Sequence, residues 1–175
     1  PLHEAQVNVV TRVLEAHGRL LGPEELKKQR DNTGLTPLSH FRTVRELEPP
    51  SKDEGFDVLE TRPFVRGVRE GGAGRFVAFE VAAKVERTDE PTFVFAWTET
   101  DQAAVEAAAA RLGATSLVCT HGGGPPTCWC RPPLPGLLLE GCHRAKLLPQ
   151  KCVVIGATET HQMLAATLGA RFVTA

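Results

Sequence analysis

The chain has 175 residues, of which 42% are hydrophobic and 23% are charged, and these proportions are typical of a globular protein and argue against disorder. The formal net charge of -1 at pH 7 excludes a global basic field of the kind that indicates nucleic-acid binding. We find neither a signal peptide nor an apolar run of about 18 residues, so we expect a cytoplasmic protein with no membrane partner.

Three helices are predicted in the first third of the chain. The first covers residues 2–17, where valines and a leucine recur at helical spacing, and Gly18 follows as a left-handed stop. A second, short helix over residues 23–30 begins with proline and two glutamates. The third covers residues 39–48, starts on a Ser39 cap and is stopped by two prolines.

Strands and helices then alternate. Segments rich in Val and Phe predict strands over residues 56–66, 75–85 and 92–97. Helices are then predicted over residues 101–112, 135–147 and 160–168, and strands over residues 115–119, 151–156 and 170–173. This alternation predicts an α/β fold, with a parallel sheet and helices on its faces. We therefore expect a helical segment over residues 1–66 and a compact α/β domain over residues 75–175.

Four candidate metal ligands lie within twelve residues, in the pattern C-x-H-x6-C-x-C. They are Cys119, His121, Cys128 and Cys130, and the residues GGGPPT between them let the chain reverse. Three sulfurs and one imidazole, with no carboxylate, are typical of a closed, structural Zn²⁺ site, so we expect Zn²⁺ as a structural cofactor. The alternative is a set of buried thiols without metal. An odd number of cysteines, concentrated between residues 119 and 152, favours a metal over disulfides.

Three residues near these ligands have simpler expected roles. Trp129 lies between two of the ligands and is expected to shield the metal from water. Cys142 and Cys152 fall on a predicted helix and a predicted strand, and we expect them to be core residues.

Two segments resemble the zinc-containing branch of the haloacid dehalogenase (HAD) phosphatases, the heptose bisphosphate and histidinol phosphate phosphatases. They read CTHGGGPPTCWCRPPLPGLLLEG (residues 119–141) and VVIGATETHQMLAATLGARFV (residues 153–173). That branch carries C-x-H, a short loop and C-x-C-R-K-P-x-P-G, then V-G-D-x-x-S-D and A-x-x-x-G-A. The resemblance covers about residues 75–175 and implies a small doubly wound parallel sheet with a structural zinc loop over residues 119–130.

The chemistry of that family depends on aspartates, and the matching positions of this chain lack them. The attacking position is Glu80, which is one methylene longer than aspartate, and the acid/base position two residues on is Ala82. The hydroxyl that binds phosphate after the second strand of the domain survives as Thr98.

The remaining parts of that machinery are also replaced. Pro132 stands where the family has a lysine that neutralises the phosphoryl charge, and Ala157 and His161 stand where it has aspartates that hold Mg²⁺. Loss of one such part costs a factor of about 10²–10⁴, and loss of all of them removes the mechanism. The resemblance therefore implies a degenerate phosphatase without catalytic residues, in which these positions are vestigial.

Residues 41–66 resemble the end of the kinase domain in polynucleotide kinase/phosphatase enzymes, whose pattern is a short helix, Φ-E-x-P, E-G-F and a strand that ends in P-F. The matching letters here are LEPP, EGF and PF. Residues 4–19 correspond to the preceding lid helix, which implies that Arg12 lies near nucleotide phosphates. The chain has no G-x-x-x-x-G-K-[ST] loop. The resemblance thus implies the C-terminal part of a bacterial kinase of that type, whose ATP-binding portion lies in the same or another chain.

These observations predict a zinc-stabilised, non-catalytic module of a polynucleotide-kinase-like protein, with a scaffold or nucleic-acid-end recognition role in nucleic-acid repair. Two alternatives stay open. One is an active phosphatase or end-processing enzyme that uses rearranged residues such as Glu80, Thr98 and His161. The other is a regulatory protein-interaction domain unrelated to nucleic acid.

Overall fold

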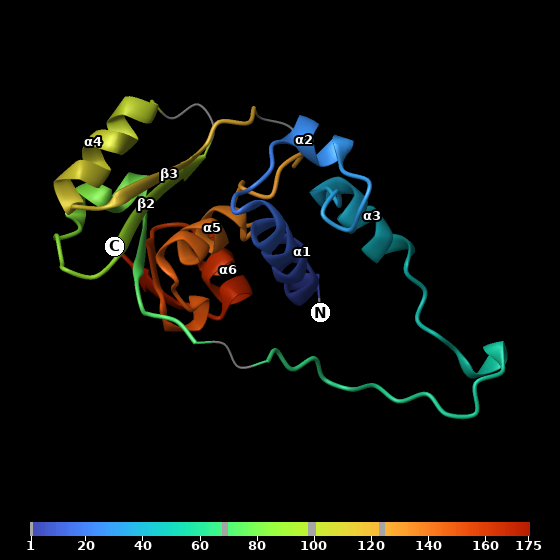
Figure 1. Ribbon diagram of the computed structural model, residues 1–175. Helices are drawn as coiled ribbons and strands as arrows, with labels where there is room; N and C mark the ends of the chain where they lie inside the picture. The colour runs from blue at the N-terminus through green and yellow to red at the C-terminus, as the bar shows by residue number, and fades with distance from the viewer. Residues whose placement is uncertain (1, 68–69, 98–100, 123–124) are drawn as a thin grey trace.

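The structure is a computed structural model that describes residues 2–67, 70–97, 101–122 and 125–175. Figure 1 shows a twisted sheet with helices on its faces, preceded by N-terminal helices and a long extended segment. The sheet has five strands, all parallel. The α/β fold that the alternation of strands and helices predicts is therefore confirmed.

Helix α1 (Leu2–His17) buries one apolar stripe, as its residue spacing predicts. The buried side chains are Gln6, Val7, Val9, Val10, Val13 and Leu14. The helix ends at Gly18, whose φ of 69° is left-handed. Its apolar face packs against α5 (Gly136–Ala145) and α6 (Glu159–Leu168), so α1 adds a further layer outside the helices on one face of the sheet.

Two short helices follow α1. Helix α2 (Pro23–Lys28) begins with proline at its first position, as predicted. Helix α3 (Pro37–Glu46) starts earlier than predicted, because Thr36 and not Ser39 is the capping residue. The Ser39 N–H donates to the Thr36 hydroxyl at 3.2 Å, and a proline follows the cap directly, which suits a first helical position better than a serine does.

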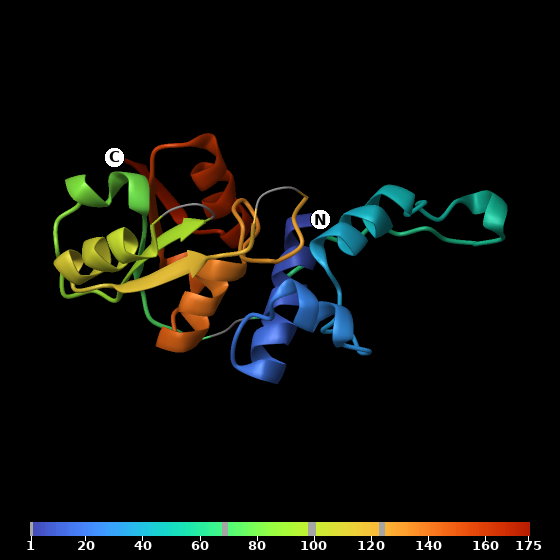
Figure 2. The same cartoon turned by 90° about the horizontal axis from the view of Figure 1, so that it is seen from above.

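Residues 47–66, here called the arm, project away from the sheet (Figures 1 and 2). The strand predicted over residues 56–66 is wrong, since the only regular element of the arm is a short 3-10 helix, η1 (Lys52–Glu54). A strand needs a neighbour for its N–H and C=O groups, and no described strand pairs with the arm. Its Val58 and Val65 side chains are 79% and 81% exposed.

The strand order in the sheet is β3-β2-β1-β4-β5. The strands are β1 (Arg75–Ala78), β2 (Thr92–Trp97), β3 (Thr115–Cys119), β4 (Val153–Gly156) and β5 (Arg171–Thr174). The central strand β1 pairs Phe76 with Phe93 on one side and with Val154 on the other. The winding direction therefore reverses between β1 and β4, and in doubly wound sheets ligands bind beyond the carboxyl ends of the strands at this point.

Strand β1 is shorter than the predicted strand over residues 75–85. It ends at Ala78, and the chain continues as a 3-10 helix, η2 (Phe79–Lys84). Val81 and Ala82 are buried in η2, which contacts β1, β2 and β4. The apolar residues of this segment thus cover the carboxyl edge of the sheet instead of lengthening a strand.

Helix α4 (Gln102–Leu112) packs on β2 and β3, and α5 and α6 lie on the opposite face of the sheet (Figures 1 and 2). Right-handed crossovers between parallel strands require this arrangement. Helices α4 and α6 end at Gly113 and Gly169, whose φ values of 63° and 66° are left-handed. A 3-10 turn, η3 (Pro149–Lys151), leads from α5 into β4.

One continuous hydrophobic core contains side chains of the sheet, of its helices and of α1. Trp129, Phe76 and Phe95 are among its largest fully buried side chains. The division of the chain into a helical segment and an α/β domain stays a prediction. None of the described helices is long and apolar enough to cross a membrane.

Candidate metal centre

The candidate ligands lie in the loop that joins β3 to α5. Cys119 is the last residue of β3, and Gly136 is the first residue of α5. The Gly136 N–H donates to the Trp129 carbonyl oxygen at 2.9 Å, and a Cβ atom on Gly136 would lie 2.3 Å from that oxygen. Because only glycine permits this approach, the sequence fixes the start of α5 directly against the ligand loop.

The four ligand side chains converge on one point. Nδ1 of His121 lies 3.5 Å from Sγ of Cys119 and 3.4 Å from Sγ of Cys130. Sγ of Cys119 lies 3.6 Å from Sγ of Cys128, and all four ligand atoms lie within 4.8 Å of one another. Bonds of about 2.3 Å to sulfur and about 2.0–2.1 Å to nitrogen give a zinc tetrahedron edges of about 3.5–3.8 Å. The three separations given above are near these edges, so the cluster could hold one tetrahedral ion.

The donor set limits what such an ion could do. The three thiols are buried and His121 is half-buried. Over the described ranges, this is the one group of three or more His, Cys, Asp or Glu side chains close enough to hold an ion. Four protein donors fill a tetrahedron and leave no position for a reactive water, which is typical of a structural and not a catalytic metal.

The thiols also influence one another's ionisation. Hydrogen bonds from the Cys119 and Cys130 thiols lower the pKa of Cys128 to about 2. Contacts with Cys119 and Cys128, followed by burial, raise the pKa of Cys130. Since neighbouring thiolates repel one another, a cation is needed to hold all three deprotonated. Metal uptake should therefore release protons, and metal affinity should fall as the pH falls.

Trp129 connects the ligand loop to the N-terminal helices. Its indole N–H donates to the Leu35 carbonyl oxygen at 2.8 Å, although the two residues are 94 positions apart. Its ring lies 5.8 Å from the His40 ring, and Trp129 is 1% exposed. Nε2 of His40 is buried and has no hydrogen-bond partner among the described residues, and burial lowers the pKa of His40. The indole therefore fills the space between the ligand loop and α3.

Three positions equated with the phosphatase machinery meet at the winding reversal. Glu80 follows β1, Ala157 follows β4, and His161 lies in the first turn of α6. The Ala157 N–H donates to Nδ1 of His161 at 3.3 Å, and the Phe95 ring meets the imidazole edge-on at 5.5 Å. Burial lowers the pKa of His161, and the Glu80 carboxylate opposes that shift only in part. A neutral imidazole therefore packs at the sheet edge where doubly wound folds bind ligands.

The packing of His161 at this edge is close. A Cβ atom on Gly156, the last residue of β4, would lie 2.6 Å from Nδ1 of His161. His161 itself is 4% exposed, whereas Glu80 is exposed on η2. Glu80 therefore influences His161 electrostatically, but the imidazole itself is enclosed by packing contacts.

The other proposed positions are spread over the molecule. Ala82 is buried in η2, and Pro132 is buried in the ligand loop. Thr98 lies outside the described residues. Arg12 is exposed on α1, at the rim of a hollow that Asn8 and His40 also line.

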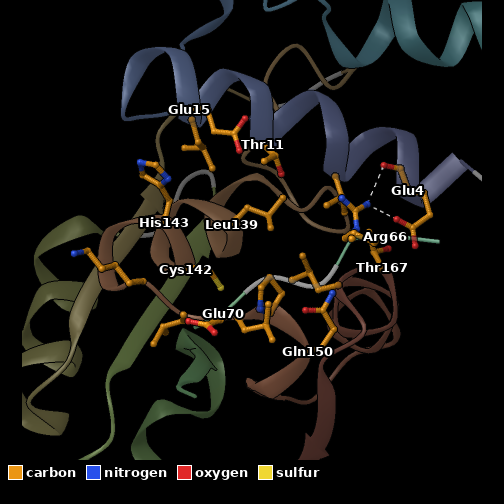
Figure 3. Close-up of a pocket in the computed structure, with 18 residues that line it drawn as sticks. Glu4, Thr11, Glu15, Arg66, Glu70, Leu139, Cys142, His143, Gln150 and Thr167 are labelled. Carbon is orange, nitrogen blue, oxygen red and sulfur yellow. Dashed lines mark hydrogen bonds and ion pairs between the residues drawn. The ribbon is translucent and has the colours of Figure 1, made fainter. Parts of the chain in front are cut away.

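A larger hollow, of about 710 Å³, lies between α1 and the ends of α5 and α6 (Figure 3). Leu139 and Cys142 line it from α5, and Thr11 lines it from α1. At its rim Arg66 donates to Oδ1 of Asn8 at 2.7 Å and to the Glu4 carboxylate. Sequence reasoning missed this hollow because its walls come from distant segments that share no motif.

Compared with protein-family models, with curated proteins and with solved structures, the chain gives no match.

Proposed function

We propose that this chain is a zinc-stabilised, catalytically degenerate HAD phosphatase-like module of a polynucleotide-kinase-like protein, with a scaffold or nucleic-acid-end recognition role. The observation that carries the proposal is the convergence of three thiols and one imidazole nitrogen within 4.8 Å in the loop after β3. Zinc is the ion we assign, because thiolate and imidazole donors in a tetrahedron suit Zn²⁺ better than Mg²⁺ or Ca²⁺. When bound, the zinc would hold the ligand loop in its fold and supply no reaction chemistry.

Loss of phosphatase chemistry is supported by the residues at the carboxyl edge of the sheet. The positions of the acid/base and of one magnesium ligand are Ala82 and Ala157, which have no titratable side chain. His161 is held in packing contacts by Gly156 and Phe95. The exposed carboxylate of Glu80 acts electrostatically on this buried, neutral imidazole, and such a pair is too little for phosphoryl transfer.

Association with a kinase is supported by the N-terminal part of the chain. The arm has many exposed apolar side chains, and Leu47, Val58 and Val65 are each more than 70% exposed. Such exposure is unusual for an isolated surface and typical of a contact with another polypeptide. Residues 41–66 resemble the C-terminal segment of a kinase. We therefore take that polypeptide to be a P-loop kinase portion in the same or another chain.

The first expected result is the absence of phosphatase turnover. A generic phosphomonoester incubated with the protein and Mg²⁺ should be hydrolysed at the rate measured in buffer alone. The Glu80→Gln variant should give the same rate, because no nucleophile is lost with that carboxylate. Magnesium-dependent turnover that disappears in Glu80→Gln would instead favour the active end-processing enzyme, whose motivating observation is the proximity of Glu80 to His161.

A second expected result concerns nucleic-acid ends. Short single strands should bind weakly, and the binding should weaken as salt rises from about 50 to about 200 mM, because phosphate contacts release counterions. Arg12→Ala should reduce the slope of log affinity against log salt by about 1, as expected for one lost phosphate contact. Arg45→Ala, which removes an exposed charge from α3, is the matched control and should leave the slope unchanged. Binding that no salt concentration changes, or no binding at all, would favour the protein-interaction domain.

A further inference from the structure

Trp129 separates two of the candidate metal ligands and shares their burial. It lies between Cys128 and Cys130 in the sequence, and all three side chains are buried. Its carbonyl oxygen accepts the Gly136 N–H at 2.9 Å, which ties the backbone at residue 129 to the start of α5. A competing ligand can remove a bound ion only by reaching it past these buried groups. Movement of the Trp129 ring is therefore a step that would open a path to the thiols.

The Trp129 ring contacts a segment far away in the chain, residues 33–46, here called the flap. The flap consists of a short connection followed by α3. The Trp129 indole N–H donates to the Leu35 carbonyl oxygen at 2.8 Å, and the ring lies 5.8 Å from the His40 ring. Leu35 and Phe41 are partly buried and pack against the hydrophobic core. The docked flap therefore holds the Trp129 ring in its buried position.

The flap itself is held by few contacts. Within α3 only Pro37 and His40 are buried, and α3 makes no broad contact with another described helix or strand. Nε2 of His40 is buried without a hydrogen-bond partner among the described residues, and the desolvation of this nitrogen opposes docking. Elements with few buried contacts open locally while the rest of a protein stays folded. We therefore expect the flap to open more often than the sheet does.

From these contacts we propose that the flap controls zinc exchange. While α3 is docked, Trp129 covers Cys128 and Cys130, and a bound ion leaves only after the flap has opened. The inference rests on the proposed zinc site, and it adds a control of that site by a segment whose contact residue, Leu35, is 94 positions from Trp129 in the chain. Coordination then depends on the four ligands, whereas the rate of zinc loss depends on the docking of α3.

The test is the rate at which an excess of a chromophoric chelator removes Zn²⁺ from the zinc-loaded full chain. Trp129→Phe keeps an aromatic ring and all four ligands but loses the N–H that Leu35 accepts. His40→Ala removes the ring contact from the flap side. Each variant should release zinc about 3- to 10-fold faster than the wild type, as expected for one lost hydrogen bond or ring contact. Amide hydrogen exchange in α3 should rise by the same factor, because one opening event controls both rates.

A control variant separates opening of the flap from global unfolding. Phe76 is buried on the central strand β1, where its ring stacks on Phe93. Phe76→Leu weakens the sheet and should release zinc at the wild-type rate. Release from Phe76→Leu as fast as from Trp129→Phe and His40→Ala, or release from those two variants at the wild-type rate, would overturn the inference. A wild-type chain that binds no Zn²⁺ would overturn the proposed zinc site instead.

Discussion

Replacement of Cys128 by alanine is expected to abolish metal binding and cooperative unfolding together. Zinc contributes roughly 10 kcal/mol or more to the folding of small modules, and the whole stability of a domain is about 5–15 kcal/mol. Cys128 is buried and lies 3.6 Å from the sulfur of Cys119. Its loss would leave two thiols and an imidazole, which cannot close a tetrahedron.

The measurement is metal content after purification without chelator, followed by thermal unfolding. One zinc per chain is expected for the wild type and none for Cys128→Ala. Cys152→Ala is the matched control, because Cys152 is equally buried but its thiol donates to the Leu148 carbonyl oxygen at 3.3 Å, outside the cluster. That variant should keep its zinc and lose only about 1–2 kcal/mol. A wild-type chain without metal that melts normally would contradict the assignment.

Replacement of Trp129 by alanine is expected to cost about 3–5 kcal/mol, the range for removal of a large aromatic side chain from a core. The indole is fully buried, and its removal also leaves the Leu35 carbonyl oxygen without its donor and the His40 ring without its neighbour. The N-terminal helices should lose their attachment to the ligand loop before the sheet unfolds, because the four metal ligands remain.

Urea unfolding of the zinc-loaded protein measures the loss in the free energy of unfolding. Amide hydrogen exchange shows which segments lose their protection. Exchange should rise first in residues 20–46 and only later in β1 and β4. Trp97→Ala is the control, since Trp97 is half-buried at the end of β2, where the Arg131 guanidinium lies 4.2 Å from its ring centre. It should cost less and leave exchange in the N-terminal helices unchanged. Equal effects of the two substitutions would show that Trp129 does not attach the N-terminal helices to the ligand loop.

Local patterns predicted most of the elements because their causes are local. Gly18, Gly113 and Gly169 end helices with left-handed φ values of 69°, 63° and 66°, a conformation that glycine adopts without steric cost. The four ligands could be found as a group because a loop of twelve residues brings them together whatever the rest of the chain does. Helix starts were less secure, since the Thr36 and Ser39 hydroxyls can both cap a helix and only the hydrogen bonds decide between them.

Strand prediction failed where a partner was needed. Residues 56–66 and 75–85 are both rich in Val and Phe, yet only Arg75–Ala78 form a strand, because two neighbours flank them. The arm has the same residue types, but no described strand pairs with it, so its backbone is extended and most of its side chains are exposed. Residue type indicates which side chains suit a strand, whereas pairing with a neighbouring strand decides whether the strand forms.

The sequence by itself determined the α/β class, the glycine stops of α1, α4 and α6 and the four ligands, since each of these follows from a local pattern along the chain. Only the tertiary structure decided that His161 is buried at the winding reversal and that Trp129 reaches Leu35. Those contacts join residues far apart in the chain, and their geometry follows from how α1 and the N-terminal helices pack on the sheet. No spacing rule encodes such packing, because it depends on the shape of every side chain in the core at once.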